Sequence, residues 1–273
     1  MRAAVVGHTE WIEFGRVDRV PRAGEIAHAT DVWQEAGGGG AVASVQLSRL
    51  AGDCDLFTAF GDDPAGAASR RRLSTLGAQV HAEVRRGVST RRAVTLVDTG
   101  GERTITTLGD RLEPHATEPL PWKLLEETDA VYLTAGDPEA FRLARRARVM
   151  VVTLRALGRL AESGVEADCL VGSARDPLER WAPGALPEPP PLLVRTEGAE
   201  GGSFVTREGA RGRFEAEAPA GAVVDTYGAG DTFAAGLTFA LGIGMDVGKA
   251  LAFAAHCGAV CVTGRGPYGA RIA

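Results

Sequence analysis

The feature that most constrains the fold is a repeated alternation of short apolar runs with helix-like segments. Residues 3–7 form an apolar run that ends at a glycine, as is typical of a strand buried on both faces of a parallel sheet. Residues 55–61 read as a second strand, and residues 64–76, followed by Gly77, read as a helix. This alternation predicts an α/β fold with a mainly parallel sheet. Further strands are expected at residues 130–134, 149–153, 169–171 and 192–196.

A second group of segments has the pattern of strands with one wet face. Residues 11–33 mix apolar and polar side chains in alternation, with Pro21 and Gly24 between them. Residues 92–97 and 102–108 flank an Asp-Thr-Gly-Gly turn, which predicts a β-hairpin. We expect this hairpin to pair with the 11–33 segment in a separate small sheet.

Composition excludes several classes of protein. The 273 residues are 45% hydrophobic and 24% charged, which is typical of a globular chain and not of a disordered one. A net charge of −5 disfavours nucleic-acid and anionic-membrane partners, because both need a cationic surface. The longest apolar stretches, residues 233–245 and 250–262, fall short of the roughly 18 residues of a membrane span. We interpret both as buried helices.

The four cysteines, Cys54, Cys169, Cys257 and Cys261, form no C-x-x-C pair. A chain with a large core needs no disulfides, so we expect reduced thiols. No secretory leader is recognisable at the N-terminus. These features predict a cytoplasmic protein.

The most specific chemical signal is a glycine-rich turn that leads into an apolar helix within residues 223–237. Free N–H groups at a helix start, together with the helix dipole, bind anionic oxygens such as those of phosphate. Gly228 and Gly230 allow close approach, and Asp231 places a carboxylate in the first turn. Such a carboxylate can accept a proton during phosphoryl transfer. The alternative is purely structural: Asp231 complements the helix dipole and the glycines permit tight packing.

The segment D-T-Y-G-A-G-D, from Asp225 to Asp231, resembles the C-terminal signature of the ribokinase-like (PfkB) family of carbohydrate and nucleoside kinases. That signature is D-T-x-G-A-G-D followed by a small-residue helix. The resemblance implies that Asp231 is the catalytic base. It also implies that the amides of Gly228, Ala229 and Gly230 form the anion hole.

Other segments resemble the family's motifs in the same order along the chain. They are the P-x-x-G-E strand at residues 21–25, the glycine-rich first signature at 37–50, the G-D-D-x-x-G at 61–66, the lid hairpin at 91–105, and the ATP-site strand and turn at 195–201. The resemblance therefore covers nearly the whole chain.

The fold that this resemblance implies is a three-layer α/β/α sandwich with a mainly parallel central sheet and a small β-sheet lid. Residues 1–273 would form a single domain, with the lid at about 11–35 and 91–108. The family also implies a homodimer that can form through the lid.

The family implies ATP, Mg²⁺ and K⁺ as cofactors. Asp176 retains a carboxylate at the end of the family's magnesium-linked N-x-x-E motif, although it equally suits the start of a helix before Pro177. Asp225 would lie at the monovalent-cation site. The nucleotide would contact Thr196, Gly198, Gly201 and Thr226.

The substrate-binding motifs depart from the family pattern. Glu10 and Ile12 stand where the family has the asparagine and aspartate of an N-x-D pair, and Gly39 and Val42 replace a lysine and an asparagine. A site built to hydrogen-bond hydroxyl groups discriminates strongly through them, so these losses argue against ribose or another plain sugar. The acceptor would instead contact Glu10, Gly38, Gly39, Val42 and Arg103.

Two tryptophans in the predicted lid, Trp11 and Trp33, leave two interpretations open. Their faces could stack on a nucleobase or a sugar ring. Alternatively, they pack the lid against the main domain, because tryptophans are highly buried on average.

The resulting prediction is an ATP-dependent kinase that transfers the γ-phosphate to a hydroxyl of a small molecule: a sugar, a sugar derivative or a nucleoside. The alternative is a noncatalytic nucleotide- or ligand-binding regulatory protein that keeps the kinase fold. A protein that had lost catalysis would not be expected to keep Asp231 and its whole turn while losing only its acceptor contacts, so the kinase interpretation is favoured. P-loop enzymes and nucleophile-elbow hydrolases are disfavoured because neither G-x-x-x-x-G-K-[ST] nor G-x-S-x-G occurs.

Overall fold

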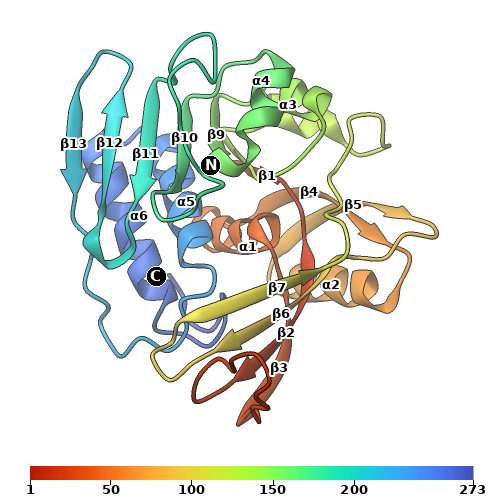
Figure 1. Cartoon of the computed structure of the whole chain (residues 1–273). Coiled ribbons are helices and arrows are strands. Elements are labelled where there is room, and N and C mark those ends of the chain that lie inside the picture. Colours follow the sequence, from red (N-terminus) through yellow and green to blue (C-terminus); the bar gives the residue numbers. More distant parts are fainter. Residues whose placement is uncertain (273) are drawn as a thin grey trace.

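The computed structural model describes residues 1–272 and contains two β-sheets (Figure 1). The larger sheet has nine strands in the order β13-β12-β11-β10-β9-β8-β1-β4-β5. Its seven strands from β11 to β5 pair in parallel, and β12 and β13 add an antiparallel edge. The strands are β1 (Ala3–Val6), β4 (Cys54–Gly61), β5 (Ala78–Arg85), β8 (Ala130–Leu133), β9 (Val149–Thr153), β10 (Cys169–Ser173), β11 (Leu192–Thr196), β12 (Gly202–Thr206) and β13 (Arg211–Phe214).

Helices cover both faces of this sheet, as the alternation of side chains along β1 shows. Ala3 and Val5 belong to one buried cluster, with residues of α1, α5 and α6, whereas Ala4 and Val6 belong to a second cluster, with residues of α3 and α4. The fold is therefore a three-layer α/β/α sandwich. The helices are α1 (Gly39–Ala51), α2 (Pro64–Thr75), α3 (Pro138–Ala144), α4 (Leu157–Ser163), α5 (Ala229–Gly242) and α6 (Val247–Cys261), with short 3₁₀ turns η1 (Trp122–Glu127), η2 (Leu154–Ala156) and η3 (Gly198–Glu200).

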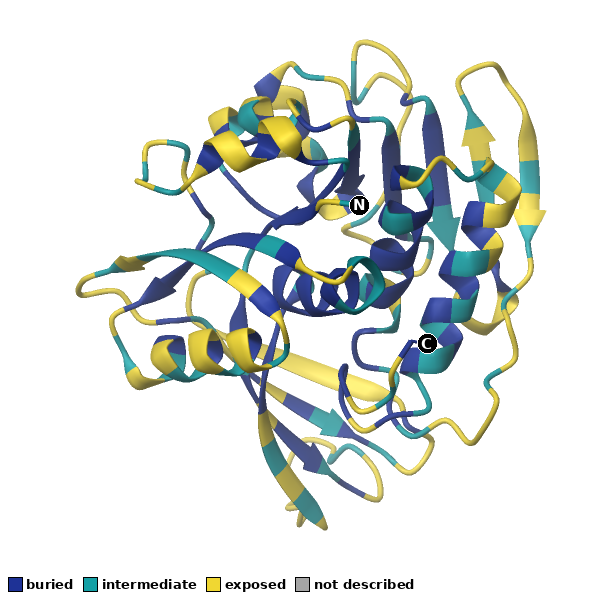
Figure 2. Ribbon diagram, turned by 180° about the vertical axis from the view of Figure 1, so that it is seen from behind, coloured by how far each residue is buried: buried dark blue, intermediate teal, exposed yellow. Residues whose placement is uncertain are grey.

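The smaller sheet, here called the lid sheet, consists of β2 (Glu10–Arg16), β3 (Asp31–Gly37), β6 (Arg92–Val97) and β7 (Arg103–Leu108) in the order β3-β2-β6-β7. The hairpin β6–β7 joins β2 through a parallel pairing. The side chains of Ile12 and Phe14 on β2 are fully buried, whereas all six residues of the outer strand β7 are exposed (Figure 2). The lid sheet thus has one packed face and one open face.

The structure confirms the α/β fold class, the predicted strands and helices, and the pairing of the hairpin with the N-terminal segment. Strand β5 was not predicted, although Val80, Ala82 and Val84 alternate with polar residues along it. It lies at the edge of the large sheet, where half-exposed side chains weaken the apolar signal. Within residues 1–272, no helix combines the length and apolarity that a bilayer crossing requires.

Candidate active site

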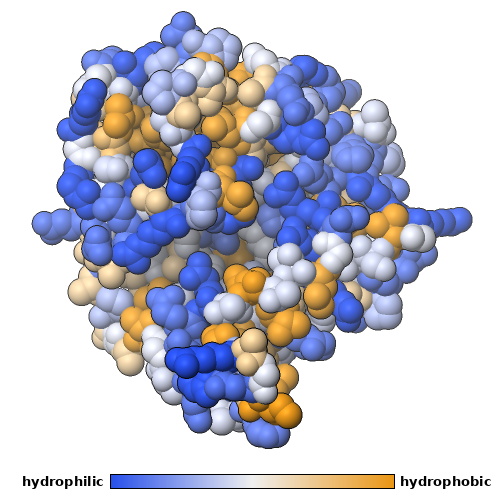
Figure 3. All heavy atoms as spheres, viewed as in Figure 1, coloured by the Kyte–Doolittle hydropathy of each residue, from blue (hydrophilic) through white to orange (hydrophobic). Residues whose placement is uncertain are grey.

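A cavity of about 830 Å³ lies between the lid sheet and the large sheet. Its floor includes Thr134, Thr153, Ser173 and Thr196, which stand at or just beyond the carboxyl ends of four neighbouring parallel strands. Open α/β sheets bind ligands at this end of their strands. Figure 3 shows the molecular face hollowed between the lid sheet and the main body.

The start of helix α5 forms one wall of the cavity. Gly228 is the N-cap residue with φ of 82°, and a side chain there would meet Val42 and Pro267. The first N–H that bonds back into the helix belongs to Thr232, which donates to the Gly228 carbonyl. Of the earlier amides, that of Ala229 donates only weakly, at 3.4 Å to the Thr226 carbonyl. The helix therefore presents N–H groups to the cavity, where Gly228 and Gly230 line the wall.

Asp231 stands in the first turn of α5 and lines the same cavity. Its Oδ1 atom lies 3.0 Å from the position that a Cβ atom on Gly39 would occupy. Burial, followed by the negative charge of Glu179, raises the pKa of Asp231 to about 7, and the cations Arg103 and Arg155 oppose this shift. The carboxyl group can therefore exchange a proton near neutral pH.

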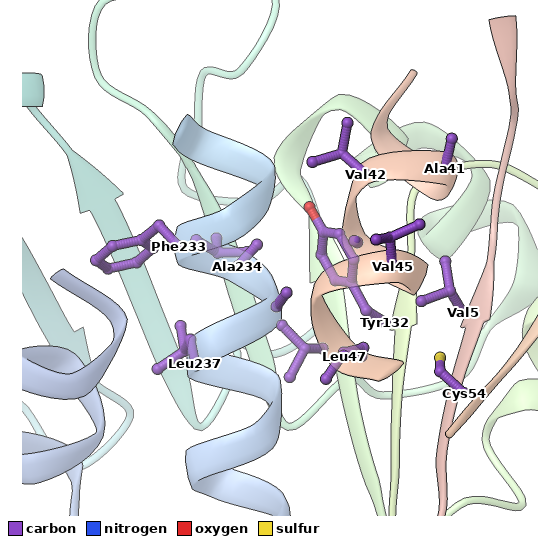
Figure 4. Close-up of a cluster of buried hydrophobic side chains, with 14 of the residues drawn as sticks. Val5, Ala41, Val42, Val45, Leu47, Cys54, Tyr132, Phe233, Ala234 and Leu237 are labelled. Carbon is purple, nitrogen blue, oxygen red and sulfur yellow. The ribbon is translucent and has the colours of Figure 1, made fainter. Parts of the chain in front are cut away.

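The glycine-rich segment before α1 and the one before α5 contact each other directly. The Gly38 amide donates a hydrogen bond of 3.0 Å to the hydroxyl of Tyr227. Behind this contact, Val42, Val45 and Leu47 of α1 and Ala234 and Leu237 of α5 belong to one buried apolar cluster (Figure 4). This packing holds the carboxylate of Asp231 against the start of α1.

Asp225 is fully buried and organises the loop before α5. Its two carboxylate oxygens accept the amides of Tyr227 at 2.8 Å and Gly266 at 3.0 Å. Burial raises the pKa of Asp225, and these two hydrogen bonds oppose the shift. The carboxylate is engaged with the backbone of the loop on both sides.

His8 and Glu10 also line the cavity and lie beside Gly38. Glu10 Oε1 lies 3.2 Å from Arg91 Nε and 3.7 Å from His8 Nε2. Burial raises the pKa of Glu10, whereas burial and the nearby arginines lower the pKa of His8 to about 3. His8 is therefore neutral, and its Nδ1 atom lies 3.4 Å from the hydroxyl of Thr134.

Two predicted acceptor contacts, Gly38 and Val42, are not among the residues that line the cavity. Val42 is fully buried below Gly228 and does not line the cavity, and Ile12 packs against Gly37. Trp33 stacks on Phe14 with ring centroids 4.8 Å apart, and Arg265 covers its ring at 4.2 Å. Trp11 packs against the core. The packing interpretation of both tryptophans therefore agrees with the structure, and neither lines the cavity.

The residues predicted to contact the nucleotide do not all lie together: some lie at or beside the cavity, and Thr226 contacts the lid sheet. Thr196 lines the cavity, and Gly198 borders it through Arg175, whose Nη1 atom would lie 3.1 Å from a Cβ on Gly198. Gly201 cannot carry a side chain, because its Cβ would lie 2.1 Å from the Phe214 carbonyl oxygen. Thr226 instead contacts the lid sheet: its amide donates to the Gly101 carbonyl at 2.9 Å, and its hydroxyl accepts from Arg103 at 3.3 Å.

Asp176 and Glu179 line the cavity and both form ion pairs with Arg155. The chain after Asp176 forms turns, so the interpretation of this residue as the start of a helix is wrong. Within residues 1–272, no group of three or more His, Cys, Asp or Glu side chains is arranged to hold a metal by itself. The two carboxylates Asp176 and Glu179 suit Mg²⁺, because proteins often hold this ion through one or two carboxylates together with substrate phosphates and water.

Most of the charged residues of the cavity were not predicted from the sequence. His8, Arg91, Arg111, Arg155, Arg175 and Glu179 line it beside the predicted Glu10, Gly39, Arg103, Asp176 and Thr196, together with Gly228, Gly230 and Asp231. Arg91 and Arg175 lie within segments that resemble family motifs but are not fixed positions of them, and the other missed residues belong to no motif. The one usable signal was position, because Arg155 follows a predicted strand by two residues at the edge where parallel strands end.

Sequence comparisons find one family model, described as pfkB family carbohydrate kinase, which matches residues 2–181 and 165–271. An ATP-dependent ribose-1-phosphate kinase from Halopiger xanaduensis is 29% identical over 100% of this chain and 95% of its own length. A ribokinase from Dictyostelium discoideum is 34% identical over 106 residues, which span 38% of this chain and 33% of that protein.

Solved structures share the fold at lower identity. A ribokinase from Thermotoga maritima matches with a TM-score of 0.76 and 21% identity over 99% of this chain and 96% of its own. Arabidopsis thaliana ribokinase, in complex with ribose and ATP, matches with a TM-score of 0.75 and 20% identity over 97% and 93% of the two chains. Because the family model covers nearly the whole sequence, this chain belongs to the pfkB family of carbohydrate kinases, which are phosphotransferases.

Proposed function

We propose that this chain is an ATP-dependent kinase that phosphorylates a hydroxyl of a sugar, a sugar derivative or a nucleoside, with Asp231 as the general base. One observation carries the proposal: a carboxyl group with a pKa of about 7 lies in the first turn of α5, beside the N–H groups of that helix and within one cavity. A base whose pKa lies near the working pH is best suited to proton transfer.

In the proposed reaction, the acceptor hydroxyl loses its proton to Asp231 as its oxygen bonds to the γ-phosphorus of ATP. The bond from that phosphorus to the bridging oxygen breaks, and ADP leaves with the electron pair. The N–H groups at the start of α5 stabilise the charge on the transferring group. Water is excluded in part by the lid sheet, which covers one side of the cavity.

The proposed nucleotide region lies toward Thr196, Gly198 and Arg175, at the ends of β10 and β11. Asp176 and Glu179 are the carboxylates that would hold Mg²⁺ there, directly or through water. The ion, when bound, neutralises charge on the ATP phosphates. Arg155, which now pairs with both carboxylates, keeps them oriented toward the cavity.

The relatives support an acceptor from the sugar group of compounds. One is named for ribose 1-phosphate and matches over the full chain, and another is named as a ribokinase and matches over part of it. The buried Ile12 and Val42 leave this chain without two polar contacts that a plain sugar would use. We therefore propose a sugar derivative ahead of ribose itself.

The test is ADP release from Mg-ATP, with K⁺ present, across sugars, sugar phosphates and nucleosides. A kinase of this type releases ADP rapidly with one class of acceptor and slowly with water alone. If ATP binds but no acceptor in the panel increases ADP release, the noncatalytic alternative is favoured and the proposal fails. Omission of Mg²⁺ should abolish the stimulated rate.

The acid limb of the pH profile of kcat/KM should shift in opposite directions in two variants. Glu179→Gln removes a negative charge that raises the pKa of Asp231, so the acid limb should move to lower pH. Arg103→Met removes a positive charge that lowers this pKa, so the limb should move to higher pH. The position of the limb is the readout, because either substitution can also change the plateau rate. Shifts in the same direction would contradict Asp231 as the titrating base.

A further inference from the structure

We propose that the acceptor carries a phosphate group, and that Arg91 and Arg111 bind this phosphate in the part of the cavity that His8 and Glu10 line. The inference rests on the proposed kinase function and names the chemical class of its acceptor. It also assigns a second anion site, separate from the helix start that would receive the transferred phosphoryl group.

Arginine is concentrated in this cavity although the whole chain carries a net charge of −5. A guanidinium group forms paired hydrogen bonds with phosphate oxygens, so arginine suits the recognition of phosphate esters. The five arginines of the lining are Arg91, Arg103, Arg111, Arg155 and Arg175.

These arginines have different local partners. Arg155 is paired with both Asp176 and Glu179, and Arg175 pairs with Glu200 near the proposed nucleotide region. Arg103 reaches Thr226 beside the start of α5. Arg91 and Arg111 are the two that remain, and both come from segments adjoining the lid hairpin.

Arg91 has unused hydrogen-bonding capacity. Its Nε atom is buried and, within the described part of the chain, has no hydrogen-bond acceptor, although Glu10 Oε1 lies 3.2 Å away as an ion-pair partner. An unsatisfied buried donor is costly. Arg111 binds Glu113 through Nη2 at 2.9 Å, and Glu113 is also shared with Arg159 at 3.5 Å. Glu10 therefore leaves the Nε donor of Arg91 unsatisfied, and Arg111 shares its carboxylate partner, Glu113, with Arg159.

Both arginines act on the same two side chains. Burial is the main cause that lowers the pKa of His8, and the next causes are the charges of Arg111 and Arg91. Arg91 and Arg111 also oppose the burial that raises the pKa of Glu10, and Arg155 has a smaller effect in the same direction on both His8 and Glu10. The positive charges of Arg91 and Arg111 therefore act together at His8 and Glu10.

The charge of Glu10 acts both on Arg91 and on Asp231, the proposed catalytic base. Glu10 lies beside Arg91, and its charge also raises the pKa of Asp231, although less than burial and Glu179 do. The other charges that act on the pKa of Asp231 are those of Glu179, Arg103 and Arg155. In the proposed arrangement, a sugar lying over Gly39 presents a hydroxyl to Asp231 while its phosphate meets Arg91 and Arg111, which line the same cavity.

The kinetic test compares ribose 5-phosphate and ribose 1-phosphate with ribose in the wild type and in Arg91→Met and Arg111→Met. We expect the preference for the better phosphorylated acceptor over ribose to fall by about 10- to 100-fold in each variant, as the loss of hydrogen bonds to a charged group predicts. Arg92→Met is the matched control, because Arg92 is exposed and lines a different cavity. An equal loss with ribose, or a loss expressed as a higher KM for ATP, would overturn the assignment.

A binding test separates this inference from the proposed reaction. Calorimetric titration of Asp231→Asn with each ribose phosphate, without nucleotide, should detect binding that Arg91→Met weakens in the double variant. Inorganic phosphate should compete with the ribose phosphate. If such binding occurs while no acceptor supports turnover of the wild type, the kinase proposal fails and the phosphate site stands. If the ribose phosphates bind no more tightly than ribose, the phosphate site is refuted.

Discussion

Asp231→Asn is expected to lower kcat by about 10²- to 10⁴-fold, the usual contribution of a general base. Asparagine keeps the size of the side chain but cannot accept the proton of the acceptor hydroxyl. The affinity for ATP should change little, because the N–H groups at the start of α5 remain. Steady-state ADP release and equilibrium binding of ATP measure the two effects. A variant that retains near-normal kcat would exclude Asp231 as the base.

The same substitution should stabilise the folded protein above neutral pH. The folded-state pKa of about 7 exceeds the ordinary value of 3.8, so the unfolded chain releases the Asp231 proton at lower pH than the folded protein, and stability falls as the pH rises from about 4 to 7 and stays at the lower level above 7. The gain for asparagine should be on the order of 1 to 4 kcal/mol at pH 8 and should disappear below about pH 4. Urea unfolding at both pH values measures it. Lower stability of the variant at pH 8 would show that Asp231 is not held in a desolvating environment.

Gly40→Ala is expected to destabilise the fold by about 1 to 3 kcal/mol or more, as overpacking of a rigid contact does. An added Cβ would lie 2.6 Å from the carbonyl oxygen of His8 and 2.8 Å from the carbonyl carbon of Gly7. Both are backbone atoms and cannot rotate away. The Gly40 amide also donates to the His8 carbonyl at 3.1 Å, so the strain would displace His8 and the start of α1. Urea unfolding and acceptor KM are the measurements.

Gly158→Ala provides the matched control for this effect. Gly158 lies in α4, is exposed, and has no atoms within 4 Å of an added Cβ. The substitution should be neutral or stabilise the protein by up to about 1 kcal/mol, because alanine favours the helix. If Gly40→Ala were as well tolerated as the control, the close approach of α1 to the loop after β1 would be refuted.

Much of the architecture could be predicted because it depends on local patterns. The apolar run at the N-terminus and the strand ending at Gly61 could be placed from their own residues, and so could the helix after Pro64. Strand β5 escaped prediction because, at the edge of the sheet, its side chains are mostly half-exposed. Its pairing with β4 is what makes it a strand.

The candidate site was predictable only where one contiguous segment builds it. The turn from Gly228 to Asp231 brings an anion site and a carboxylate together within a few residues. Arg91, Arg111 and Arg155 belong to no common motif, and their proximity depends on how the lid hairpin and β9 meet in space. The pKa of Asp231 is likewise a tertiary property, because burial and Glu179 raise it.

The sequence by itself determined the α/β layers, the small second sheet and the helix start that carries Asp231. Hydrophobic period, turn residues and helix ends act over a few neighbouring residues, so a linear pattern records them. Only the tertiary structure decided that Val42 is a core residue, that Trp33 stacks on Phe14, and that five arginines line one cavity. These outcomes depend on contacts between segments distant along the chain, and desolvation and charge act there through space.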